Sequence, residues 1–159
     1  MRQTINRLLG VLAIYLSLLD ACAMMNVNKA AAMMTKDGTN VIMVVSIQPA
    51  EANSATLTFS MIGQLGAAAK YKAKIFTNLD ITGKCSNVGT IYDPYQGIPG
   101  NSPRDLGDVS INSNTFTPPS LTGVKLELKG PNTVIGKTMV LVNLATGVND
   151  FCGPIGIVE

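Results

Sequence analysis

The strongest constraint on the fold is a strict alternation of apolar and polar residues in two short segments. Residues 55–62 alternate Ala, Leu, Phe and Met with Thr and Ser, and residues 70–76 alternate three lysines with Tyr, Ala and Ile. Successive side chains of a β-strand point to opposite faces, so a period of two is typical of a strand with one buried face. Both segments are therefore predicted to be strands that border a core.

Short β-type runs separated by turn residues continue along the chain, and Asp37-Gly38 is a strong hairpin-turn signal. The 159 residues suffice for one domain with a single core. About eight such runs predict an all-β protein, an eight-stranded Greek-key β-barrel or sandwich. Periodicity alone leaves an immunoglobulin-like sandwich open, although the chain lacks the core Trp of a true immunoglobulin domain. The other runs are 29–35, 41–48, 109–111, 124–128, 138–142 and 155–158.

The N-terminus has the pattern of a secretory signal. Two arginines precede an apolar run at 8–19 that is too short to span a bilayer well, and small residues follow it. We expect a signal peptide at 1–23 and a secreted, extracellular domain at 24–159; an uncleaved membrane anchor is the alternative. After cleavage we expect no membrane association. No basic field large enough for nucleic acid is present.

The chain contains no histidine, which excludes a Ser-His-Asp nucleophile, and we predict no catalytic residue. Even so, residues 78–106 form a long segment rich in Gly, Pro, Asn and Asp, and a loop longer than about 15 residues is usually functional or a relic of function. Removal of the signal would leave Cys85 and Cys152 as an even pair, which suits an oxidising compartment.

Several short motifs, in order, resemble the copper/zinc superoxide dismutases. The resemblance extends through essentially the whole mature chain and implies that family's barrel, with an intrasubunit disulfide between Cys85 and Cys152. It also implies that the last strand contributes to a dimer contact. Pro154 lies in that strand and lacks a backbone donor, so we expect it to weaken the contact. The motifs are Gly83–Gly89, Tyr92–Pro94, Gly100–Asp108, Ile135–Val140 and Cys152–Ile157.

The resemblance also implies where the metal ligands should lie, and almost all of them are replaced. Only Asp105 retains a zinc-ligand residue type. Copper chemistry needs several imidazoles, and a lone carboxylate cannot hold zinc, which takes about four ligands. We therefore expect no copper or zinc cofactor. The vacated copper and zinc positions are Lys74, Phe76, Ile91, Pro99, Ser102 and Val142, and the lost anion-guiding position is Asn149.

Apolar side chains are expected to close the vacated site, with Phe76, Ile91 and Val142 filling it and Tyr92 and Tyr95 packing beside them. The methionines on strand faces are expected to fill the core, because Met fits irregular gaps. These methionines are Met33, Met43, Met61 and Met139.

Two groups of charged residues could have a specific binding role. The stripe of Lys70, Lys72 and Lys74 is interpreted as a solvated strand face, with an anion or acidic-partner patch as the alternative. The aspartates at 93, 105 and 108 are candidates for Ca²⁺, but the usual spacing of a calcium loop is absent and turn capping is favoured.

The sequence therefore predicts a superoxide-dismutase-like pseudoenzyme that acts as an extracellular binding protein. Its partner would be an unknown extracellular protein, a second copy in a homodimer, or a true dismutase in a heterodimer. Two alternatives stay open. One is an active dismutase that converts superoxide to oxygen and hydrogen peroxide with non-standard ligands, and the other is a carrier of a small ligand.

Overall fold

The computed structural model describes residues 29–50, 54–63, 68–96, 102–112, 115–117 and 124–158, so the expected signal peptide at 1–23 lies outside the described residues. Eight strands form one antiparallel sheet in the order β3-β2-β1-β8-β7-β4-β5-β6. The strands are β1 Ala30–Thr35, β2 Val41–Pro49, β3 Ala55–Met61, β4 Ala69–Phe76, β5 Asp108–Asn112, β6 Thr115–Thr117, β7 Thr138–Asn143 and β8 Asn149–Ile157.

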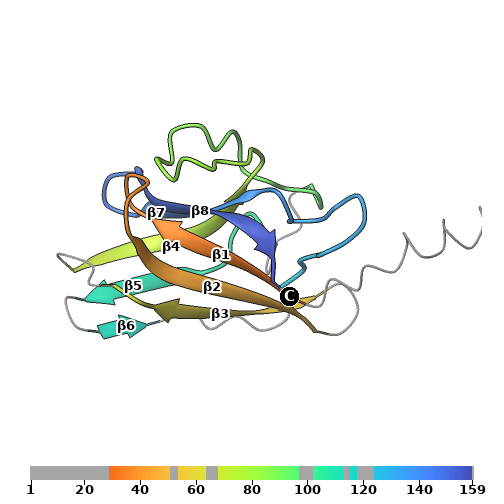
Figure 1. Ribbon diagram of the computed structural model, residues 1–159, viewed down its shortest axis with the longest axis horizontal. Helices are drawn as coiled ribbons and strands as arrows, with labels where there is room; N and C mark the ends of the chain where they lie inside the picture. Colours follow the sequence, from red (N-terminus) through yellow and green to blue (C-terminus); the bar gives the residue numbers. More distant parts are fainter. Residues whose placement is uncertain are drawn as a thin grey trace, which may run out of the picture.

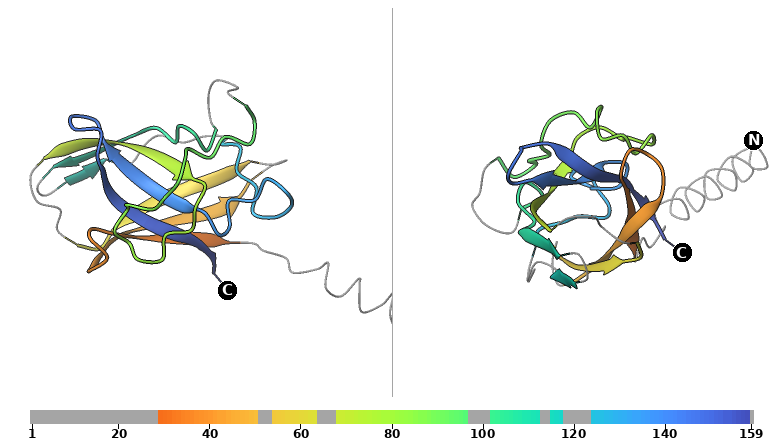
Figure 2. Two further views of the ribbon diagram at one scale, coloured as in Figure 1. Left: turned by 90° about the horizontal axis from the view of Figure 1, so that it is seen from above. Right: turned by 90° about the vertical axis from the view of Figure 1, so that its left-hand side faces the viewer.

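The prediction of an all-β protein is confirmed, and the sheet curls around its own interior (Figures 1 and 2). The first and last strands, β1 and β8, are neighbours, and β7 pairs with β4 on its other side. Within the described ranges the strand order ends at β3 and β6. The run predicted at 124–128 is not a regular strand there; Val124 forms an isolated bridge with Ala55.

Alternation decides which side chains enter the core. The outward lysines of β4 separate the buried Tyr71, Ala73 and Ile75, and β3 alternates buried and exposed residues. Met43 and Met139 are fully buried, and Met61 packs against the core. The prediction for Met33 is wrong: its side chain is 60% exposed, because β1 turns Ala30, Ala32 and Met34 inward instead.

The Asp37-Gly38 turn lies where the sequence predicts it, between β1 and β2, and both residues have positive φ angles of 55° and 70°. Such angles are typical of tight hairpin turns. The amide of Gly38 donates to the carbonyl of Gly83, 2.9 Å away, so this turn also supports the long loop. In the described part of the chain, no helix is long and apolar enough to cross a membrane.

Candidate functional site

Three of the positions implied by the dismutase resemblance, Lys74, Phe76 and Val142, lie on the outer face of β4 and β7, beneath the loop that follows β4 (Figure 1). The β4–β7 register pairs Lys72 with Val142 and Lys74 with Val140. Val140 in turn pairs with Cys152 of β8. Directly paired residues of neighbouring strands share a face of the sheet, so these side chains form one outer surface.

A small apolar cluster, separate from the main core, occupies this outer face. Val142 packs against it, and Val140 and Cys152 are completely buried within it. Two of the vacated copper positions, Phe76 and Val142, thus belong to a closed hydrocarbon surface. We call this set the outer cluster: Phe76, Cys85, Val88, Val140 and Cys152, with Val142 against it.

Ile91 does not fill the site as expected. Its backbone forms an isolated bridge with Phe76, but its side chain is 37% exposed and it is not among the residues packed on the outer cluster. The two tyrosines also lie elsewhere. Tyr92 packs against the main core, and Lys137 lies 4.4 Å from the centre of its ring. Burial, then the charge of Glu127, raises the pKa of Tyr92.

Tyr95 is fixed by a carboxylate rather than by the outer cluster. Its hydroxyl donates to Glu127 Oε1 over 3.0 Å, and Lys125 lies over its ring at 5.6 Å. Burial, together with the hydrogen bond and the negative charge of Glu127, raises the pKa of Tyr95 to about 12. The loop path that carries both tyrosines toward 125–137 had no signal in the sequence.

The disulfide implied by the resemblance is present and joins Cys85 of the long loop to Cys152 of β8, with the Cα atoms 5.5 Å apart. The two cysteines are separated by 67 residues. In the chain-entropy model, closing a loop of this size stabilises the folded state by about 4 kcal/mol. The bond therefore holds the loop against the outer cluster.

The Asp80 carboxylate orders a local turn within this loop, a role that sequence reasoning missed. The carboxylate is buried, and Oδ1 accepts hydrogen bonds from the amide and the hydroxyl of Thr82 at 2.9 and 2.6 Å. Burial alone would raise its pKa; the Thr82 bonds and the nearby amides of Cys85 and Gly83 outweigh this, so the pKa is lowered. Neither amide makes a hydrogen bond with Oδ2. The Asp-x-Thr spacing typical of a local turn was the available signal.

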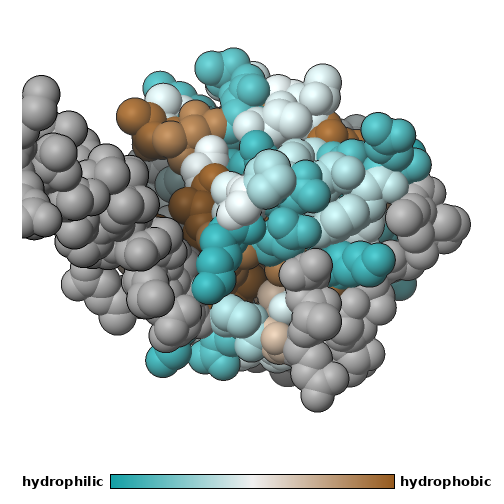
Figure 3. Space-filling model, turned by 90° about the vertical axis from the view of Figure 1, so that its right-hand side faces the viewer, coloured by the Kyte–Doolittle hydropathy of each residue, from teal (hydrophilic) through white to brown (hydrophobic). Residues whose placement is uncertain are grey.

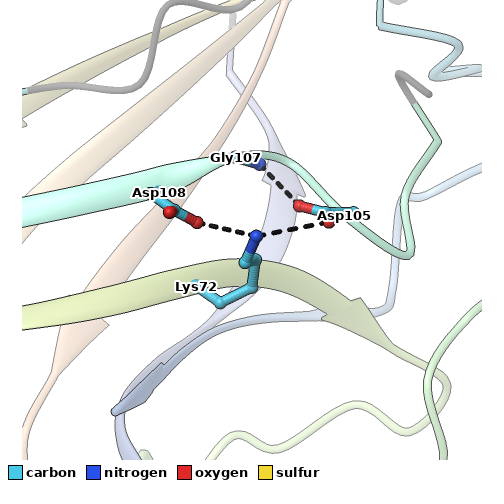
Figure 4. Close-up of polar contacts among 4 residues, drawn as sticks. All are labelled: Lys72, Asp105, Gly107 and Asp108. Carbon is cyan, nitrogen blue, oxygen red and sulfur yellow. Dashed lines mark hydrogen bonds and ion pairs between the residues drawn. The ribbon is translucent and has the colours of Figure 1, made fainter. Parts of the chain in front are cut away.

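Asp105, the one retained zinc-ligand residue type, is already paired (Figure 4). Its Oδ2 lies 3.3 Å from Lys72 Nζ, and its Oδ1 accepts the Gly107 amide at 3.0 Å. Asp108 Oδ1 lies 2.7 Å from the same Nζ. The hydrogen bond to Asp108 raises the pKa of Lys72, burial opposes this, and the Asp105 carboxylate adds to the increase.

The three aspartates considered for Ca²⁺ do not share one partner. Asp93 accepts a bond from Arg104 at 3.3 Å, whereas Asp105 and Asp108 both contact Lys72. Across the described ranges, no group of three His, Cys, Asp or Glu residues is placed to hold a metal ion. Capping is observed instead, since Asp105 accepts the amide of Gly107.

The remaining implied positions carry no strong metal donor. Lys74 is partly buried on β4, and Asn149 starts β8 opposite Val142. Ser102 is buried, and its carbonyl accepts the amide of Asp105. Pro99 lies outside the described residues.

The donors at these positions do not fit copper or zinc. The described ones offer an ammonium, a phenyl ring, aliphatic groups, a hydroxyl and an amide, and none is an imidazole. Copper needs nitrogen or sulfur ligands suited to both of its oxidation states, and zinc needs about four ligands where only Asp105 survives. The Lys72 ammonium would also repel an incoming cation at Asp105.

Known proteins place the chain in a family. No protein-family model matches it. It is 29% identical over 119 residues to a Cu-Zn superoxide dismutase of Podospora anserina and 30% identical over 119 residues to that of Claviceps purpurea (strain 20.1). Each match covers 71% of this chain and 77% of the relative. The chain therefore belongs to the copper/zinc superoxide dismutase family.

A solved structure supports the same fold. The crystal structure of the clock protein EA4 superimposes with a TM-score of 0.63 at 20% sequence identity. The match covers 82% of this chain and 95% of that one. At this identity the likeness concerns the fold alone.

Proposed function

We propose that this chain is a secreted member of the dismutase family that binds neither copper nor zinc and does not dismutate superoxide. Its proposed role is to bind another protein chain. The observation that carries the proposal is the replacement of the copper positions Phe76 and Val142 by side chains of the closed outer cluster. We also propose that the strands complete the Greek-key barrel typical of the family.

The chemistry of the remaining side chains supports the loss of catalysis. Superoxide dismutation passes single electrons between two superoxide molecules, and the family does this with a copper ion held by imidazoles. Hydrocarbon at 76 and 142 supplies no ligand, and it excludes the water and anions that such a reaction requires. A metal pocket that lost its ion but kept polar walls would bury polar groups without hydrogen-bond partners, which destabilises the fold. Apolar side chains can instead pack together and fill the space.

Secretion is part of the proposal. The signal-like pattern at 1–23 supports it, and so does the Cys85–Cys152 disulfide, because such bonds persist mainly in oxidising compartments.

An exposed apolar face is the surface we propose for a partner. Thr138 accepts the Asp80 amide, donates to the Asn78 carbonyl and pairs with Pro154, so the 78–81 segment lies over the outer side of β8. On the face of the molecule shown in Figure 3, apolar side chains gather toward the upper left. We group four exposed apolar residues on the outer side of β8 and its neighbours as the β8 face: Met33 of β1, Leu79 and Ile81 of the segment held by Thr138, and Val158 after β8, exposed by 60, 51, 80 and 45%.

We propose a second copy of this chain as the occupant of the β8 face. A side chain at Gly156 would meet nothing within 4 Å, so another backbone can approach β8 closely there. A two-fold dimer brings the same apolar face of each copy together and so hides both from water. Sedimentation equilibrium would show a homodimer as a complex of twice the monomer mass. A heterodimer with a true dismutase, or a complex with another extracellular partner, would have a different mass.

Metal content and activity of the purified protein test the loss of catalysis. The protein is incubated with copper and zinc, freed of excess metal, and assayed for bound metal and for superoxide removal. We expect no stoichiometric copper and no turnover. Stoichiometric copper with turnover would establish an active dismutase with unusual ligands and end the proposal.

A further inference from the structure

Two carboxylate oxygens of the β4–β5 corner converge on a single point, which Lys72 Nζ occupies (Figure 4). Asp108 Oδ1 lies 2.7 Å and Asp105 Oδ2 3.3 Å from that nitrogen. Lys72 and Asp108 are direct cross-strand partners, and the Gly107 amide holds the other oxygen of Asp105. Convergent oxygens around a point of positive charge are the arrangement that a hard cation also selects.

Backbone contacts hold the chain positions of both aspartates beside β4, and the Gly107 amide also holds the carboxylate of Asp105. The amide of Ala73 donates to the Gly107 carbonyl over 3.0 Å, and the amide of Leu106 donates to the Ala73 carbonyl over 2.9 Å. These bonds join the residue after Lys72 to the two residues between Asp105 and Asp108, and they do not involve the lysine side chain. The two aspartates are therefore expected to stay side by side when the lysine side chain is replaced, with both carboxylates within reach of one cation.

We propose that Lys72 is the built-in cation of this corner and keeps divalent ions away from Asp105 and Asp108. The inference rests on the proposed function and extends it. It identifies Lys72 as the group that keeps Asp105, the one retained zinc-ligand residue type, free of metal. An ammonium at the point of convergence repels a divalent ion and occupies the oxygens that would bind it. Removal of the ammonium opens a small oxygen-lined site for Ca²⁺.

Two neighbouring lysines provide matched controls. Lys70 and Lys74 project from the same face of β4, and neither forms an ion pair with any described residue. A change at Lys74 alters the net charge as a change at Lys72 does, but it uncovers no carboxylate. A general effect of charge on cation binding therefore appears in both variants, whereas the proposed effect appears only at Lys72.

Calcium titration by calorimetry tests the proposal with Lys72→Met, Lys74→Met, the wild type and the double variant K72M/D105N. We expect K72M to bind Ca²⁺ with a Kd in the millimolar range typical of weak extracellular sites, at least about tenfold more tightly than the wild type or K74M. The double variant should lose this gain. Equal affinity of K72M and K74M, or of K72M and the wild type, would overturn the proposal.

A second arm keeps the test decisive if K72M and the milder Lys72→Gln both fail to fold. Zn²⁺ titration then compares the wild type with Asp105→Asn. Equal affinity of the two supports the proposal, and tighter binding by the wild type overturns it, because Asp105 would then be open to metal. Copper uptake with turnover would instead contradict the proposed function and leave the role of Lys72 intact.

Discussion

The amide nitrogen of Asp80 lies 2.8 Å from the hydroxyl oxygen of Thr138, 58 residues further along the chain. The same hydroxyl donates to the carbonyl of Asn78 at 2.7 Å. Thr138 is completely buried, so one β7 side chain satisfies two backbone groups of the loop where water cannot replace it. This contact and the disulfide are two of the points that hold the loop over the outer cluster.

Thr138→Val should therefore destabilise the fold. The substitution keeps the side-chain volume but leaves the Asp80 amide and the Asn78 carbonyl without their partner, at a cost of about 1–3 kcal/mol. Chemical denaturation measures the change in the free energy of unfolding. Thr39→Val is the control, because the Thr39 hydroxyl makes one exposed bond, to the Lys36 carbonyl. Equal losses in the two variants would contradict a special role for Thr138.

The outer cluster should contribute measurably to stability. Phe76→Ala removes its aromatic side chain and is expected to cost about 3 kcal/mol, because the cavity cannot fully collapse beneath the disulfide-tied loop. Ile91→Ala changes the neighbouring but 37%-exposed side chain and should cost well under half as much. Thermal and chemical denaturation compare the two variants. A cost at Ile91 that matches that at Phe76 would show that the site is filled differently.

Tyr95 should make the fold sensitive to alkali. Its pKa is raised from 10.0 to about 12 in the folded state, so folding favours the neutral phenol. The resulting stabilisation is complete below pH 10 and is lost as the pH rises from 10 to about 12. Tyr95→Phe should remove this part of the pH dependence of the unfolding free energy. Identical pH profiles for the wild type and Y95F would contradict the raised pKa.

The β8 face should control assembly. Ile81→Glu places a charge on its most exposed apolar residue and is expected to convert a dimer into a monomer, as measured by sedimentation equilibrium. Ile62→Glu is the control, since Ile62 is also largely exposed but directly follows β3 at the far end of the sheet order. A wild-type protein that stays monomeric at high concentration would refute the proposed partner.

Alternation was sufficient to predict the faces of β3 and β4 from the sequence, because one side of each strand is plainly polar. It failed in β1, where consecutive alanines and two methionines give no sign of which side is buried. Only the pairing of Ala32 with Ile155 and Val45 decides that Met34, and not Met33, enters the core.

The candidate site was predictable where it depended on residue type and unpredictable where it depended on register. The lack of imidazole ligands follows from the sequence alone. The contact of Lys72 with Asp108, 36 residues away, requires the antiparallel register of β4 and β5. The paths of Tyr92 and Tyr95 depend on tertiary contacts with the 125–137 segment, which no local pattern encodes.

The ammonium beside Asp105 has a consequence for how such a protein matures. A positive charge that is covalently part of the chain is synthesised with it, so it needs no delivery by a chaperone and no supply from the surroundings. Chelators cannot strip it, and starvation for trace elements cannot withhold it. The corner between β4 and β5 is thus complete as soon as the polypeptide folds.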